Sequence, residues 1–231
     1  MKIKKNLFRF LPKDILMLVR FEYLSKVGRF FSKRLKVDKE RMNYVHLGCG
    51  NTYIEEMINI DFFSNQNKDY GLDLRYPFKI DSDCIDGIFC EHTFEHLSHS
   101  EIKNSLAECY RILKQGSKIR VIVPDMSIFI KKYYEDDEEW FQKWKVEVLG
   151  FPSRLHMCEY YTKLFALNFT SNFYGHKSSW DFETGKFFLE KAGFSNIKKF
   201  AANEGSCELL FDSGKESRQM LSLYIEGEKL T

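Results

Sequence analysis

The stretch YVHLGCGNTYIEEMINID, residues 44–61, decides the fold because two short apolar runs flank a glycine turn. Gly48 and Gly50 follow the first run, where glycine lets the backbone turn sharply and lets a ligand approach without a Cβ in the way. Asp61 ends the second run, a place where a carboxylate accepts hydrogen bonds from two ribose hydroxyls. The stretch therefore predicts a ligand held between the glycine turn and this carboxylate.

The spacing of these residues narrows the kind of ligand. Asp61 lies 13 residues after Gly48, whereas a dinucleotide-binding unit separates its glycines and its acid by about 20 residues. The third glycine of that fingerprint is absent, and Thr52 stands near its place. This argues against a pyrophosphate lying on a helix N-terminus. It also predicts that the connecting helix is a single turn or missing.

After residue 41, short apolar runs alternate with helical periods. This pattern predicts an α/β fold with a mainly parallel sheet and helices on both faces. The strands are expected near residues 43–47, 57–61, 69–73, 85–90 and 118–123, in NIKKFAA (196–202) and in LSLYIEGEKL (221–230).

Two helices are indicated by their end signals. One is expected to start at Ser100 and stop at Gly116, and the other runs from Asp181 to Gly193. Residues 126–180 between them are rich in aromatic side chains and are interpreted as an insertion that covers the site. Its acidic run, EDDEE at 135–139, is interpreted as a solvated helix face.

The chain divides into a basic N-terminal extension and one main domain. At 231 residues it is long enough for a single domain with an appendage, and we place the boundary between residues 1–41 and 42–231. Residues 1–41 hold 13 lysines and arginines against four acidic residues. The favoured interpretation is a helical lid that packs on the main domain. A membrane-surface helix and a nucleic-acid-binding patch are the alternatives.

The cellular setting is predicted from what the sequence lacks. No run approaches the roughly 18 apolar residues of a membrane span, and no signal peptide with a cleavage site is present. The six cysteines form no CxxC pair, which favours reduced thiols. We expect a cytoplasmic protein, with residues 1–41 as the candidate contact with the inner face of the membrane. Nucleic acid is not an expected partner, and the oligomeric state is left open.

The ordered set HLGCG, INID, DLRYPF, GIFCEHTFEHL, ECYRILKQGSKIRVIVPD, KAGF and LSLYIEGEKL resembles the class I S-adenosylmethionine-dependent methyltransferases. It is similar especially to the predicted methyltransferases found among polysaccharide-biosynthesis proteins. The resemblance runs from about residue 43 to 228. It implies a Rossmann-like fold with a mostly parallel seven-stranded sheet, and S-adenosylmethionine as the cofactor.

The resemblance also implies a reaction. The expected function is O-methylation of a sugar or glycan precursor in bacterial surface-polysaccharide synthesis. The alternatives are methylation of a lipid-linked or other small metabolite, and a module that binds the cofactor without catalysis.

By the same resemblance, the cofactor-binding residues follow four predicted strands. They are His46, Gly48, Cys49 and Gly50 at the first, Asp61 at the second, Asp73 and Leu74 at the third, and Glu91 at the fourth. The glycine loop would cradle the methionine part, Asp61 would hold the ribose, and Asp73 with Leu74 would bind adenine. His46 stands where the family has an acidic residue. From the residues alone, Asp73 is equally well explained as a turn or helix-cap aspartate.

Methyl transfer to a hydroxyl group calls for a base near the nucleophile. His92, next to Glu91 at the end of the fourth strand, is the first candidate for this catalytic role, and His176 is the second. Tyr174, Trp180 and the aromatic residues of 151–174 are expected to form the acceptor pocket. The alternative is that they form a hydrophobic cap over the sheet.

HTFEH, residues 92–96, also matches the HxxEH pattern of a zinc-protease helix. A protease is not expected, because the motif follows a buried strand in a nucleotide-binding layout. A divalent metal at His92, Glu95 and His96, with His176 as a later ligand, is an alternative suggested by similar clusters in some O-methyltransferases. The favoured interpretation makes the histidines pocket-lining and helix-cap residues, so no metal ligand is assigned.

Overall fold

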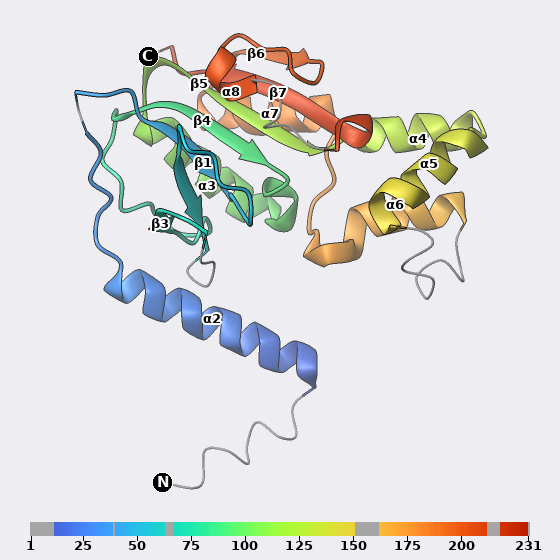
Figure 1. Ribbon diagram of the computed structural model, residues 1–231, viewed down its shortest axis with the longest axis horizontal. Coiled ribbons are helices and arrows are strands. Elements are labelled where there is room, and N and C mark those ends of the chain that lie inside the picture. Colours follow the sequence, from blue (N-terminus) through green and yellow to red (C-terminus); the bar gives the residue numbers. More distant parts are fainter. Residues whose placement is uncertain (1–11, 39, 63–66, 151–161, 212–217, 231) are drawn as a thin grey trace, which may run out of the picture.

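A seven-stranded sheet lies at the centre of the molecule (Figure 1). The computed structural model describes residues 12–38, 40–62, 67–150, 162–211 and 218–230. The strands are β1 (Tyr44–Leu47), β2 (Ile58–Asp61), β3 (Tyr70–Gly71), β4 (Ile85–Glu91), β5 (Leu113–Pro124), β6 (Ser195–Phe200) and β7 (Ser222–Glu228). Their order is β3-β2-β1-β4-β5-β7-β6.

The direction of the strands confirms a mostly parallel sheet. Strands β1 to β5 pair in parallel, and β7 runs antiparallel to both of its neighbours, β5 and β6. The mixed sheet with its flanking helices fits a Rossmann-like class I fold. The strand order runs outward from β1 in both directions, to β2 and β3 on one side and to β4 and β5 on the other. The order therefore reverses at β1. Ligands bind at such a reversal point, at the carboxyl ends of the strands.

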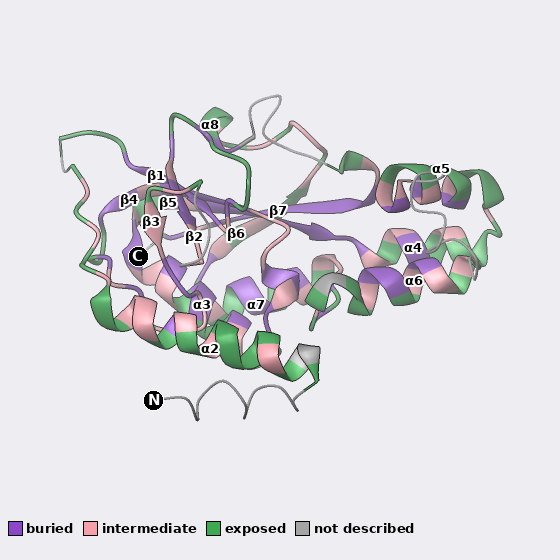
Figure 2. Ribbon diagram, turned by 60° about the horizontal axis from the view of Figure 1, so that its bottom comes forward, coloured by how far each residue is buried: buried purple, intermediate pink, exposed green. Residues whose placement is uncertain are grey.

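The two faces of the sheet are covered unequally (Figure 2). Helices α3 (His99–Ile112) and α7 (Phe182–Ala192) pack together on one face. The other face is covered by residues 54–57 and the single-turn helix α8 (Glu208–Phe211). No helix connects β1 to β2, where every residue is described. The short spacing between the glycines and Asp61 predicted this correctly.

The first predicted helix was placed wrongly at both ends. Ser98, not Ser100, caps α3, because Ser98 and Glu101 form a reciprocal capping box. The helix ends at Ile112, and Gly116 lies inside β5 with φ +77°. Its amide donates to the Lys229 carbonyl at 2.6 Å, so this glycine serves a bend in the strand rather than a helix end. The predicted ends of α7 are confirmed, with Asp181 as N-cap and Gly193 as C-cap.

Residues 126–180 contain α4 (Met126–Tyr134), α5 (Glu138–Leu149), α6 (Lys163–Asn172) and a 3₁₀ helix, Phe173–Gly175. These helices project beyond the carboxyl end of β5 in Figure 1. They share a small apolar core of their own: Phe129, Phe141, Trp144, Leu149, Ala166, Phe169 and Leu221. Within the acidic run, Asp137 caps α5 by accepting from the amide of Trp140. The remaining acidic side chains of the run are exposed, as predicted.

Helix α2 (Lys13–Phe31) lies against the edge of the sheet near β3. Its Phe21 ring stacks on Phe62 at 4.3 Å between centroids, and its Glu22 pairs with Arg75 at 2.5 Å. Much of its apolar surface remains uncovered: Met17 is 69% and Phe30 is 79% exposed. Among the helices that the structure describes, none has the length and apolarity needed to cross a membrane.

Candidate active site

The glycine turn after β1 takes a backbone shape that few other residues could adopt. Gly48 has φ +74° and Gly50 has φ +54°, both in the left-handed region. The amides of Gly48 and Cys49 donate to the Ile60 carbonyl at 2.8 and 3.1 Å. A Cβ on Gly48 would come within 2.1 Å of Thr93 Oγ1. The turn is therefore fixed between β2 and the segment after β4, with no room for a side chain at Gly48.

Asp61, at the end of β2, closes the turn from the other side. Its carboxylate accepts from the amide of Gly50 and from the amide of Phe62, both at 2.5 Å. Asp61 and both glycines line one cleft of about 860 Å³, a volume that includes its solvent-open part. The structure thus brings together the two features that the sequence predicted would enclose a ligand.

Asp73 and Leu74 line the same cleft, but the Asp73 carboxylate is already bonded. Arg75 donates to it through Nε at 2.9 Å and through Nη2 at 2.7 Å, and Ser25 of α2 donates to it as well. The nearby guanidinium and hydroxyl outweigh burial and lower the pKa of Asp73. An adenine amine could bond this carboxylate only by displacing one of these donors.

Three predicted cofactor residues lie elsewhere. His46 is 2% exposed and its Nδ1 lies 3.2 Å from Asn59 Oδ1, so it packs beneath the turn rather than lining the cleft. Burial lowers its pKa. Cys49 is also buried, which raises the pKa of its thiol to about 11. Cys49 and Glu91 line a second, more polar cavity beside the cleft.

His92 adopts a strained backbone at the junction of the cavities. Its φ is +47°, uncommon for a residue with a Cβ and typical of functional sites. Its Nδ1 lies 3.2 Å from Glu95 Oε1, and its Nε2 lies 3.1 Å from Ser222 Oγ on β7. If Nδ1 donates to the Glu95 carboxylate, Nε2 is left to accept a proton. His92 lines the cleft, the polar cavity and a third, apolar pocket.

His96 and His176 meet across the polar cavity, with ring centroids 4.7 Å apart. His96 belongs to a 3₁₀ helix, Phe94–His96, and not to the α-helix of a zinc-protease motif. Burial lowers its pKa. The loop carrying His176 is tied down because the amides of Lys177 and Ser178 donate to the Glu95 carbonyl.

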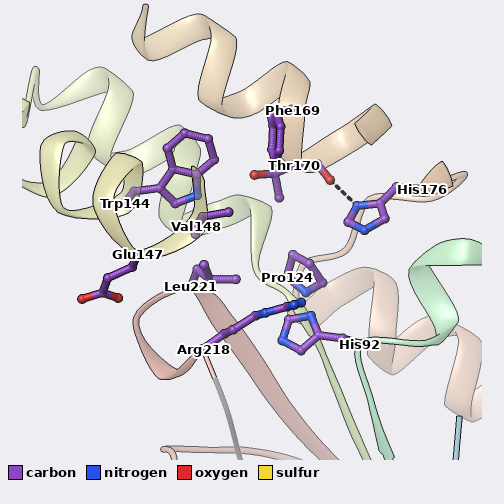
Figure 3. A pocket seen from close by; sticks show the side chains of 10 residues that line it. All are labelled: His92, Pro124, Trp144, Glu147, Val148, Phe169, Thr170, His176, Arg218 and Leu221. Atoms are coloured by element: carbon purple, nitrogen blue, oxygen red, sulfur yellow. Dashed lines mark hydrogen bonds between the residues drawn. The ribbon is translucent and has the colours of Figure 1, made fainter. Parts of the chain in front are cut away.

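The apolar pocket lies between the insertion helices and the end of the sheet (Figure 3). Its volume is about 690 Å³ with the solvent-open part included. Its lining is Pro124, Trp144, Val148, Phe169, Thr170 and Leu221, with His92, His176, Glu147 and Arg218 as its charged or titratable groups. Trp180 lies in the main core instead, and the Tyr174 side chain and residues 151–161 fall outside the described part of the chain.

Residues 45–121, about a third of the chain, match the family model described as a methyltransferase domain. This chain is a methyltransferase. The matched region contains the glycine turn, Asp61 and His92, and its cofactor is S-adenosylmethionine. The methyltransferase matched no protein in the search of curated proteins.

Several solved structures to which the chain is similar are described as methyltransferases. A SAM-dependent methyltransferase from Thermotoga maritima is 16% identical, with 92% of this chain and 91% of that chain covered and a TM-score of 0.48. One from Archaeoglobus fulgidus is 19% identical, with 91% and 93% covered and a TM-score of 0.48. Human N-acetylserotonin methyltransferase, solved with SAM, is 15% identical, with 94% and 55% covered and a TM-score of 0.44. Likeness at this level says nothing about the substrate.

The cleft of the methyltransferase fits its cofactor. The turn at Gly48 has no Cβ and exposes backbone to the cleft, and the Asp61 carboxylate is at its rim beside an aromatic ring, Phe62. Sequence reasoning missed Ser222 and Phe21, which no local motif marks. It considered Glu95 only as an alternative metal ligand and missed its contact with His92.

Proposed function

We propose that this methyltransferase methylates a hydroxyl group of a sugar or glycan precursor in bacterial surface-polysaccharide synthesis. The sugar class rests on the resemblance of the sequence motifs. The choice of a hydroxyl nucleophile rests on one observation, the position of His92 between the cofactor cleft and the apolar pocket. The bound cofactor supplies an electrophilic methyl group, and the chain's own residues have to orient the acceptor and remove its proton.

The surroundings of His92 suit a base. Glu95 orients the ring through Nδ1, and Ser222 Oγ lies 3.1 Å from Nε2. An acceptor hydroxyl that reaches Nε2 from the apolar pocket would give its proton to His92. The apolar walls of the pocket would exclude water and hold the acceptor in line with the methyl group.

The acceptor class is tested by supplying methyl-labelled S-adenosylmethionine with nucleotide sugars, glycan fragments, catechols, amines and thiols in parallel. The proposal expects label on a sugar hydroxyl, located by fragmentation of the product. Transfer only to nitrogen, sulfur or a non-sugar acceptor would overturn it.

Replacing His92 with asparagine is expected to lower the rate of methyl transfer by about 100-fold to 10,000-fold, the usual contribution of a general base. His92 also lines the cleft, so binding of S-adenosylhomocysteine is measured beside the rate and should fall far less, since the glycine turn and Asp61 are untouched. His99→Asn is the matched control, because His99 is exposed at the start of α3 and lines none of these cavities. Equal rates for the two variants would exclude His92 as the base.

A lipid-linked acceptor is a second candidate, and the surface of α2 favours it. Phe30 and Phe31 are 79% and 73% exposed, and cations such as Arg20 and Lys26 lie on the same helix. Exposed aromatic side chains with nearby cations are typical of helices that lie on anionic membranes. We place this contact in the extension, residues 1–41, next to the methyltransferase domain.

The membrane contact is tested by co-sedimentation of the full chain with vesicles. We expect binding to vesicles containing phosphatidylglycerol and loss of most of it in a Phe30→Ser, Phe31→Ser double variant. Ile130→Ser is the control, because Ile130 is a 59% exposed apolar side chain on α4. Equal sedimentation of both variants, or no sedimentation of the wild type, would exclude a membrane contact through Phe30 and Phe31.

A further inference from the structure

Glu95, His96 and His176 bring three potential ligand atoms together at the polar cavity. One ligand atom from each side chain lies within 4.8 Å of the other two. The three come from two separate segments, the 3₁₀ helix after β4 and the loop before Trp180. Two backbone hydrogen bonds to the Glu95 carbonyl, from Lys177 and Ser178, hold these segments in place.

One nitrogen of each imidazole faces the protein backbone. His176 Nδ1 lies 2.5 Å from the Thr170 carbonyl, so it must be the donor. The backbone of Gly175 faces the His96 ring and favours a proton on that side of it. In the neutral form, the remaining nitrogen of each ring carries only a lone pair. Metal-binding histidines are oriented in this way, with the second nitrogen donating to a carbonyl or carboxylate.

The carboxylate of Glu95 completes the set. Glu95 is 1% exposed, and while its Oε1 faces His92, its Oε2 is buried with no hydrogen-bond partner among the described residues. A buried carboxylate oxygen without a donor is costly. Two imidazole nitrogens and this carboxylate oxygen therefore form a group of electron-pair donors around one point.

We propose that Glu95, His96 and His176 bind a divalent transition-metal ion of the zinc class. Two imidazoles and a carboxylate suit such ions better than magnesium or calcium, which prefer oxygen ligands alone. Bonds of about 2.0–2.2 Å would draw the three side chains slightly closer together. The ion would hold the buried carboxylate and both rings in one arrangement.

The position of the site indicates what the metal does. His96 and His176 line the polar cavity together with Gly48, His92 and Arg218, so an open coordination position would face the space between the cofactor cleft and the apolar pocket. There the ion would bind an acceptor hydroxyl and make it more acidic, with His92 beside it to take the proton. This role, unlike the metal site itself, rests on the proposed function.

The test is calorimetric titration of the full chain, freed of metal with EDTA and dialysed, with Zn²⁺ alone. One equivalent is expected to bind, and His176→Ala should weaken binding by about 100-fold or more, since even outer residues of metal sites are worth 10-fold to 100-fold. Glu95→Gln should weaken it too. His99→Ala is the control for an exposed histidine and should bind as the wild type does.

The outcomes separate the proposals. No Zn²⁺ binding, or binding that His176→Ala leaves unchanged, would overturn the metal site. His176 lies on a loop, so this variant tests the site even where Glu95→Gln unfolds the protein, which circular dichroism would reveal. S-adenosylhomocysteine titrated into the same metal-free samples reports on the methyltransferase independently. If S-adenosylhomocysteine binds but Zn²⁺ does not, the methyltransferase assignment stands and the metal site is rejected.

Discussion

Gly48→Ala is expected to weaken binding of S-adenosylhomocysteine by about 100-fold or more, the equivalent of roughly 3 kcal/mol. The new Cβ would meet Thr93 Oγ1 at 2.1 Å, and alanine is strained at the φ of +74° that this turn requires, so the turn would have to move. Calorimetric titration of both proteins with the same ligand measures the difference.

Gly116→Ala is the matched control for this loss. Gly116 has φ +77°, nearly the same backbone strain, but a Cβ there meets nothing within 4 Å and the residue lines no part of the cleft. Both variants should lose similar stability from the strain, and only Gly48→Ala should lose the ligand. Tight binding by Gly48→Ala would contradict the assignment of this turn to the cofactor.

Glu226→Gln is expected to lower the free energy of unfolding by about 3–5 kcal/mol. Glu226 on β7 pairs with Arg120 on β5 at 2.9 Å, and the two side chains are 3% and 0% exposed. The substitution preserves the shape but removes the negative charge that faces the buried guanidinium at 2.9 Å. Urea unfolding followed by circular dichroism gives the value.

The control for the buried pair lies two residues along the same strand. Glu228 is only half-buried and accepts from Asn196 Nδ2 at 3.0 Å, a bond that glutamine can also accept. Glu228→Gln should change the free energy of unfolding by about 0.5 kcal/mol or less. Equal losses of unfolding free energy in the two variants would show that the buried ion pair does not contribute more than the exposed hydrogen bond.

Local periodicity was enough to predict the sheet and much of the cleft. The buried runs ending at Leu47 and Asp61 have the signature of strands covered on both faces, and the glycines marked where the chain turns. Because parallel strands place their carboxyl ends together, residues far apart in sequence could be expected at one edge. Gly48, Asp61, Asp73 and His92 do line a common cleft.

What the sequence could not supply are contacts made by distant segments. Phe21 lines the cleft and Ser25 bonds Asp73 only because α2 folds back near β3, and no spacing rule predicts that return. Ser222 faces His92 because β7 pairs with β5 in one particular register, Pro124 opposite Ser222. His46 was misleading for a similar reason. Its place in the motif predicted a contact with the cofactor. Side chains alternate between the two faces of β1, however, and His46 faces Asn59.

The boundary between residues 1–41 and 42–231 stays a prediction. Helix α2 makes specific contacts with the main domain through Glu22 and Ser25, and exposes Phe30 and Phe31. It therefore combines features of a lid and of a docking helix, which the vesicle experiment distinguishes by the contribution of the exposed pair.

The most direct test of the central claim is calorimetric titration of the full chain with S-adenosylhomocysteine, beside a parallel titration with NAD. We expect one equivalent of S-adenosylhomocysteine to bind, NAD not to bind, and Asp61→Ala to abolish the signal, because Asp61 both fixes the glycine turn and faces the cleft. No heat with S-adenosylhomocysteine, or binding of NAD in its place, would contradict a methyltransferase cofactor between these glycines and this carboxylate.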